Sequence, residues 1–134
     1  MIAKNNIFNI RATATQQWQG QTGARKGFVE FDSADSCIRA WLRLMRTYRM
    51  KYRLTTIRTI VARYAPSGEN DTWRYIDYVG KTTGIDVDRR LTTPQDYCEV
   101  GCSMAFMETG TIVEPKKIYD IMNQSKNFVT FERL

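Results

Sequence analysis

The sequence contains no histidine and only three cysteines, and these absences limit its chemistry. Zinc sites are built mainly from histidine and cysteine, and the chain has no Cys-x-x-Cys pair. We therefore expect neither a metal nor a cofactor. An odd number of cysteines does not suit a secreted disulfide framework, and Cys98 and Cys102 lie four residues apart on one predicted helix, where a disulfide has poor geometry. Buried free thiols are expected.

Long apolar runs are also missing, so no segment is predicted to span a membrane. The first fifteen residues include Lys4, Arg11 and several asparagines, and they lack the apolar stretch of a signal peptide. We expect a protein made in the cytoplasm. If it acts outside, another route must carry it there, such as a pore, a secretion machine or assembly into a virus particle.

Acidic residues are absent from Ser36 to Gly68, although the net charge of +6 draws heavily on this stretch. The basic residues there are Arg39, Arg43, Arg46, Arg49, Lys51, Arg53, Arg58 and Arg63. Such a field favours polyanions, either nucleic acid or the anionic polymers of a bacterial envelope. Alternatively, the first three arginines recur at helical spacing and form the solvated face of an amphipathic helix. No nucleic-acid reading motif accompanies the charge.

The 134 residues, 43% of them hydrophobic, predict one domain over 1–134 that can bury its own core. A polar, glycine-bearing loop is expected through Trp18 and Gly23, followed by a short strand over 27–31. Capping residues and apolar periodicity predict five helices, over residues 38–52, from 55 or 56 to about 65, from 70 or 71 to 84, from 93–94 to 107, and from 114–115 through 121.

The predicted helix that ends near Met107 is apolar on nearly all sides, which is typical of a central helix. It carries a stripe of small side chains at helical spacing, against which other helices are expected to pack closely: Cys98, Gly101, Cys102 and Ala105. Glu108 follows at its end, beside Gly110. Burial of Glu108 against Met104, Phe106 or Met107 would raise its pKa and suit it to act as a general acid. The alternative is a solvated residue at a helix end.

The run from Asn5 to Arg11, Asn-Asn-Ile-Phe-Asn-Ile-Arg, resembles the Asn-Asn-Leu-Phe-Gly-Ile-Lys stretch of bacterial glucosaminidases, which are lysozyme-like peptidoglycan hydrolases. Later features keep the family's order. Residues 28–33 resemble its aromatic-bearing strand, 38–52 its leucine-rich helix, and Tyr64-Ala65-Pro66 with 70–72 and Tyr75 its Tyr-Ala-Thr-Asp-Pro-x-Tyr segment.

The chain is also similar to small phage virion or endolysin-like proteins. These begin with an Asn-Asn-Pro-x-Asn-Ile-Arg-like motif and continue with a Trp-x-Gly element, matched by Trp18-Gln19-Gly20. A Phe-x-x-Phe-x-Ser element and an Ala-Pro-x-x-Glu-Asn-x-Thr-x-x-Tyr stretch follow, the latter matched over 65–75. The similarity covers most of residues 5 to 110.

In the glucosaminidases the catalytic glutamate lies in a Glu-Ser-Gly motif upstream of Asn-Asn-Leu-Phe. Here Glu108-Thr109-Gly110 comes late in the chain instead. The resemblance therefore implies a circularly permuted lysozyme-like fold: a mainly α domain of the α+β lysozyme type, with a central buried helix and a short β-hairpin near the N-terminus. A permutation also requires the two termini to lie near each other.

The resemblance implies Glu108, Asp71 and Tyr64 as catalytic residues. It leaves Glu69 as an alternative to Asp71 for the second catalytic group, because both lie in the loop that the family places across the cleft. It further implies that substrate is bound by Asn6, Trp18, Glu69, Asn70 and Tyr75. Each has a structural alternative: Asn70 or Asp71 as a helix cap, Tyr64 as core, Asn6 as a turn former or brace of the cleft, and Trp18 as simple packing.

These residues predict an enzyme that cleaves the glycan strands of peptidoglycan, as a glucosaminidase, muramidase or lytic transglycosylase. Its partners would be peptidoglycan and, through its basic residues, anionic wall polymers, with nucleic acid disfavoured. It would act at the bacterial cell wall, in a phage virion or in lysis. The alternative is a non-catalytic virion structural or wall-binding protein with the same fold.

Overall fold

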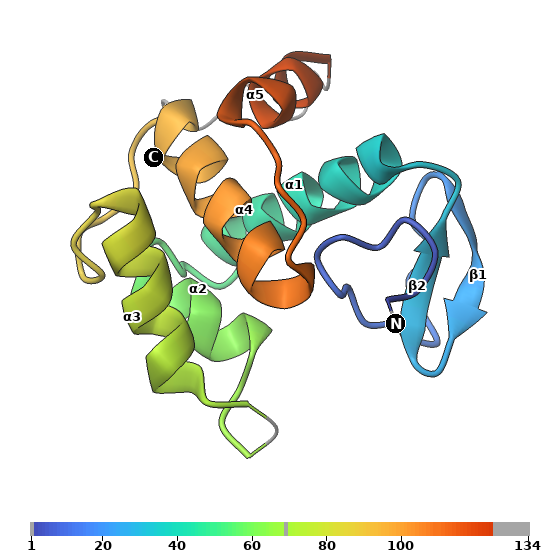
Figure 1. The fold of residues 1–134 in the computed structure, drawn as a ribbon, viewed down its shortest axis with the longest axis horizontal. Helices are drawn as coiled ribbons and strands as arrows, with labels where there is room; N and C mark the ends of the chain where they lie inside the picture. Colours follow the sequence, from blue (N-terminus) through green and yellow to red (C-terminus); the bar gives the residue numbers. More distant parts are fainter. Residues whose placement is uncertain (1, 69, 125–134) are drawn as a thin grey trace.

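A computed structural model describes residues 2–68 and 70–124 (Figure 1). The elements in chain order are β1 (Gln21–Arg25), β2 (Phe28–Phe31), α1 (Ala34–Met50), α2 (Ile57–Tyr64), α3 (Thr72–Thr83), α4 (Pro94–Thr109) and α5 (Pro115–Gln124). The fold is mainly α-helical with one antiparallel hairpin, as the resemblance implied. The predicted closeness of the two termini concerns residues 1 and 125–134, which lie outside the described residues.

Side-chain caps fix where the helices begin, and the predicted starts of α2 to α5 are confirmed within a residue or two. Helix α1 instead begins at Ala34, four residues before the predicted start, and ends at Met50, two residues before the predicted end. The Ser33 hydroxyl accepts the Ser36 N–H at the start of α1, and Thr56 and Thr93 form capping boxes at α2 and α4. Asp71 caps α3. The C-terminal ends of α3 and α4 each fall at a glycine in the left-handed conformation. The boundaries therefore follow from local chemistry.

The first strand of the hairpin was not predicted, because its residues were assigned to a polar loop. Lys26 and Gly27, with φ of 50° and 85°, make the tight turn that pairs Arg25 with Phe28, so the second strand begins one residue later than expected. Most of β1 is exposed and carries no apolar alternation. Its strand conformation depends on pairing with β2, whose Val29 and Phe31 enter the core.

Helix α4 is central to the helical part of the molecule, as predicted (Figure 1). A Cβ atom at Gly101 would lie 2.8 Å from Cδ1 of Ile118 and 2.9 Å from Cζ3 of Trp41. Helices α1 and α5 therefore both pack against α4 at this glycine. The ring of Trp41 is fully buried and stacks on Phe8, with 4.9 Å between ring centroids. This stack joins the N-terminal segment to the helices.

The N-terminal segment is irregular but firmly held between the hairpin and the end of α4 (Figure 1). The fully buried side chain of Asn6 supplies three of its hydrogen bonds. Its amide nitrogen donates to the carbonyls of Ile10 and Val29 at 2.9 and 2.8 Å, and its oxygen accepts the Ile10 N–H at 2.8 Å. The Asn6 side chain is thus occupied in bracing the segment.

The three cysteines are free thiols, with Cys37 and Cys98 buried and Cys102 half-buried. Burial raises the pKa of Cys37 and Cys102 to about 12 and that of Cys98 to about 11, which disfavours the reactive thiolate. Within residues 2–68 and 70–124, no helix is long and apolar enough to cross a membrane. The same residues hold no group of three potential metal ligands.

Candidate active site

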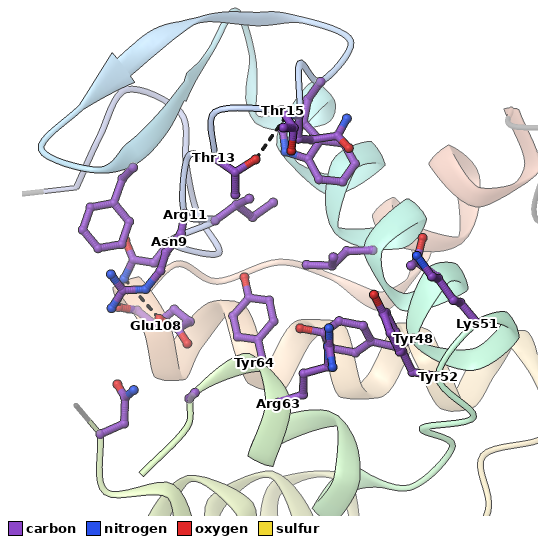
Figure 2. A pocket seen from close by; sticks show the side chains of 18 residues that line it. Asn9, Arg11, Thr13, Thr15, Tyr48, Lys51, Tyr52, Arg63, Tyr64 and Glu108 are labelled. Carbon is purple, nitrogen blue, oxygen red and sulfur yellow. Dashed lines mark hydrogen bonds between the residues drawn. The ribbon is translucent and has the colours of Figure 1, made fainter. Parts of the chain in front are cut away.

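A cleft of about 660 Å³ runs between the N-terminal segment and the helices (Figure 2). One wall comes from residues 9–18, and the other from the C-terminal end of α1 and from α2. Glu108, at the end of α4, lines the cleft close to Asn9 and Arg11. The cleft therefore unites segments from the beginning, middle and end of the sequence.

The Glu108 side chain is half-buried and held in place by Asn9. The amide nitrogen of Asn9 donates to Oε1 of Glu108 at 3.2 Å and to its backbone carbonyl at 3.0 Å. Burial raises the pKa of Glu108 above its ordinary value; the Tyr75 hydroxyl, Asn9 and the Arg11 guanidinium oppose this without cancelling it. The carboxyl group therefore keeps its proton to higher pH than an exposed glutamate, as a general acid requires. The pKa of Glu108 is thus raised, as predicted. Phe106, one of the side chains expected to bury it, is instead 47% exposed.

Two tyrosines lie beside the glutamate. The Tyr75 hydroxyl is buried near the Glu108 carboxylate, although no hydrogen bond of standard geometry joins this hydroxyl to any residue among those described. Burial and the charge of Glu108 raise the pKa of Tyr75 well above its ordinary value, so it remains a neutral phenol. Burial likewise raises the pKa of Tyr64, whose hydroxyl donates to the Phe8 carbonyl. Tyr64 thereby ties α2 to the N-terminal segment while its ring lines the cleft (Figure 2).

The structure brings together only part of the predicted site. Glu108, Tyr64, Trp18 and Asn70 all line the cleft. Asp71 does not, because its carboxylate caps α3 by accepting the Arg74 N–H at 3.1 Å and pairs with the Arg74 guanidinium at 3.7 Å.

The remaining substrate-binding predictions also need revision. Asn6 is fully buried and bonded to backbone, so it braces the cleft wall and does not reach a ligand. Tyr75 is 4% exposed and is not among the residues that line the cleft, so it does not offer a surface for substrate. Glu69 lies outside the described residues. Glu108 is thus the one carboxylate that the described part of the chain places on the cleft.

Other lining residues were not predicted as site residues. Asn9 occupies the position at which the resembling glucosaminidase motif has glycine, and its φ of 52° is left-handed. Asparagine is among the few residues other than glycine that adopt this conformation readily. An asparagine at the motif's glycine position was therefore the feature of the sequence that could have drawn attention to Asn9. Farther along the cleft lie Tyr48, Lys51, Tyr52 and Arg63. Arg43 and Arg46 border a second hollow, of about 300 Å³, with Trp18.

Fold and site together define a mainly helical protein with a half-buried glutamate on an open cleft. No family model matches the sequence. The chain is 38% identical over 114 residues to Protein P5 of Pseudoalteromonas phage PM2, and the match spans 82% of this chain and 71% of the relative. The chain belongs to the family of this phage protein.

The raised pKa of Glu108 predicts a pH-dependent stability difference between the protein and a Glu108→Gln variant. At low pH both states of the protein hold the proton, and the variant should melt at nearly the same temperature. As pH rises above the ordinary glutamate range, the unfolded chain loses the proton first, so the stability of the unsubstituted protein falls. Near pH 7 the variant should therefore be the more stable of the two proteins. Thermal melts from pH 4 to 8 measure this, and a variant that is less stable at neutral pH would contradict it.

Proposed function

We propose that this protein is a lysozyme-like enzyme that cleaves the glycan strands of peptidoglycan, with Glu108 as general acid. One observation carries the proposal: a half-buried carboxyl group with a raised pKa lies on a cleft that is open to solvent. Glycosidic cleavage requires an acid that protonates the departing oxygen as the sugar develops oxocarbenium character. The Asn9 amide fixes the direction in which this acid points.

The circular permutation that the sequence implies gains support from contacts between distant parts of the chain. The Thr109 hydroxyl donates to the Ile7 carbonyl at 2.9 Å, and the Asn9 amide bonds Glu108. The Glu-Thr-Gly and Asn-Asn-Ile-Phe segments thus lie side by side although about a hundred residues separate them. In the glucosaminidases the corresponding segments follow each other in sequence. The late glutamate would then be the family's first motif in a new position along the chain.

The described cleft supplies one carboxylate, and this restricts the second half of the reaction. In a hydrolase a second carboxylate would attack the sugar or activate water; Glu69, next to the cleft-lining Asn70, is the candidate that the sequence offers. In a lytic transglycosylase the C6 hydroxyl of the muramic acid attacks C1 instead. Glu108 would then protonate the departing oxygen and afterwards take the proton of that hydroxyl.

Product analysis on purified peptidoglycan tests the proposal. The protein is expected to release soluble glycan fragments, which carry new reducing ends after hydrolysis or 1,6-anhydro ends after the intramolecular reaction. A Glu69→Gln variant should lose activity only if hydrolysis depends on that carboxylate. If no fragments form at any pH between 4 and 8, the protein does not cleave these strands.

A non-catalytic role in the virion or at the cell wall is the second candidate. It is favoured by the phage origin of the relative and by the single carboxylate on the described cleft. Binding to insoluble cell walls without release of fragments would establish this role. Nucleic-acid binding through the basic stretch is a third, less favoured candidate, for which DNA retention at physiological salt is the test.

A further inference from the structure

At the opposite end of the cleft from Glu108, two cations are held on aromatic rings (Figure 2). Arg63 of α2 lies over the ring of Tyr52, with 3.8 Å from Cζ to the ring centroid, and 5.7 Å from the centroid of Tyr48. The Lys51 ammonium lies 5.3 Å from the centroid of Tyr52. These four residues are called the cation cluster below. Contact with the rings restrains both charges at fixed places on the cleft wall.

The cation cluster has no carboxylate partner in the described part of the chain. Other cations are neutralised in ion pairs, such as Arg58 with Asp88 at 2.6 Å and Lys81 with Asp77 at 2.9 Å. No such pair joins Lys51 or Arg63 to an acidic residue within 2–68 and 70–124. Two adjacent, uncompensated positive charges on a concave surface favour an anionic ligand.

The position of the cation cluster on the cleft restricts which anionic ligands can bind there. Because the cluster and Glu108 line one cleft, a single extended ligand can contact both. Arg63 covers one face of the Tyr52 ring at 3.8 Å, so this face cannot stack on a sugar or a base. Burial raises the pKa of Tyr48 to about 12, so its hydroxyl remains a neutral donor. The cluster thus offers positive charge and hydrogen-bond donors to an oxyanion.

We propose that the cation cluster binds the carboxylates of the peptide side chains on a peptidoglycan strand, while the strand itself lies across Glu108. This inference rests on the proposed function and specifies which peptidoglycan strands the protein would bind. The protein would bind peptide-bearing strands in preference to strands without peptides. Carboxylates on the stem peptides are the anions that such a strand carries at intervals along its length.

Binding to glycan chains with and without stem peptides tests the proposal. A Glu108→Gln background prevents cleavage during the measurement. In it, a Lys51→Gln/Arg63→Gln variant is compared with a Lys81→Gln/Lys116→Gln variant, which loses the same charge from exposed ion pairs of α3 and α5. Each protein is titrated by calorimetry with soluble peptide-bearing glycan strands, obtained from purified sacculi by cutting the peptide cross-links, and with chitin oligosaccharides, whose β-1,4-linked N-acetylated sugars carry neither peptides nor carboxylates. Thermal melting confirms that each variant is folded.

The cluster variant is expected to bind peptide-bearing strands about tenfold more weakly, which corresponds to about 1.4 kcal/mol, and to bind chitin oligosaccharides as the background does. The control should not change either affinity, and a Lys51→Arg/Arg63→Lys exchange should retain binding. An equal loss on both ligands, or no loss, overturns the proposal. So does a loss confined to DNA retention at physiological salt, which would assign the cluster to nucleic acid. If the background protein binds neither ligand, the proposed function itself fails.

Discussion

Replacing Glu108 with glutamine should lower the rate of the proposed glycan cleavage by about 10²- to 10⁴-fold, the usual contribution of a general acid. Glutamine preserves the size of the side chain and can accept the hydrogen bond from Asn9, but it has no proton to give to the departing oxygen. Clearing of purified cell walls and the release of glycan fragments measure the loss. Unchanged melting at low pH would show that the fold is intact.

The matched control for this substitution is Glu99→Gln on the same helix. Glu99 is also half-buried, but its carboxylate accepts a hydrogen bond from the Gln95 amide at 2.8 Å and does not line the cleft. Its substitution should leave cleavage within about twofold, because it alters no group near the reacting bond. Full activity of the Glu108→Gln variant, or equal losses of activity in the Glu108→Gln and Glu99→Gln variants, would contradict the assignment of Glu108 as the acid.

Trp41→Ala is expected to cause the largest loss of stability from any single change, about 3–5 kcal/mol. The indole is completely buried, stacks on Phe8 and touches the surface of α4 at Gly101. Its removal leaves a cavity where α1, α4 and the N-terminal segment meet. Urea unfolding followed by circular dichroism measures the free energy of unfolding.

Trp73→Ala supplies the control, because this side chain is 60% exposed and its ring lies against the Arg58 guanidinium, with 5.1 Å from Cζ to the ring centroid. It should cost less than about 1 kcal/mol. Trp41→Phe should fall between the two, since Nε1 of Trp41 has no hydrogen-bond partner among the described residues and the substitution removes that buried donor. Equal losses at positions 41 and 73 would contradict the central role of the stack.

Local signals account for the parts of the fold that the sequence predicted well. Helix starts at Thr56 and Thr93 depend on a cap and its neighbours three residues away, and such spacing is visible in the sequence. The strand β1 could not be predicted, because exposed polar residues adopt it only when β2 provides a partner. The strand conformation of β1 therefore depends on the pairing of β1 with β2.

The site was predicted less completely for a similar reason. Glu108 was identifiable from its place at the end of an apolar helix, but Asn9, its hydrogen-bond donor, lies 99 residues away in sequence. Asp71 illustrates the opposite error, since a helix cap and a catalytic acid present the same residue type before a helix. The arginines between positions 39 and 63 indicated a polyanion or a solvated face. Only tertiary packing shows that Arg63 lies on the cleft beside Tyr52.

The contacts between residues 7–9 and 108–109 also determine when the site can exist during synthesis. The ribosome completes the hairpin and α1 long before it reaches α4, so the nascent chain contains Asn9 but lacks its partner. Closing this loop of about a hundred residues is among the last steps of folding, because such a contact costs the most chain entropy. The candidate site is therefore expected to form only after nearly all of the described chain has left the ribosome.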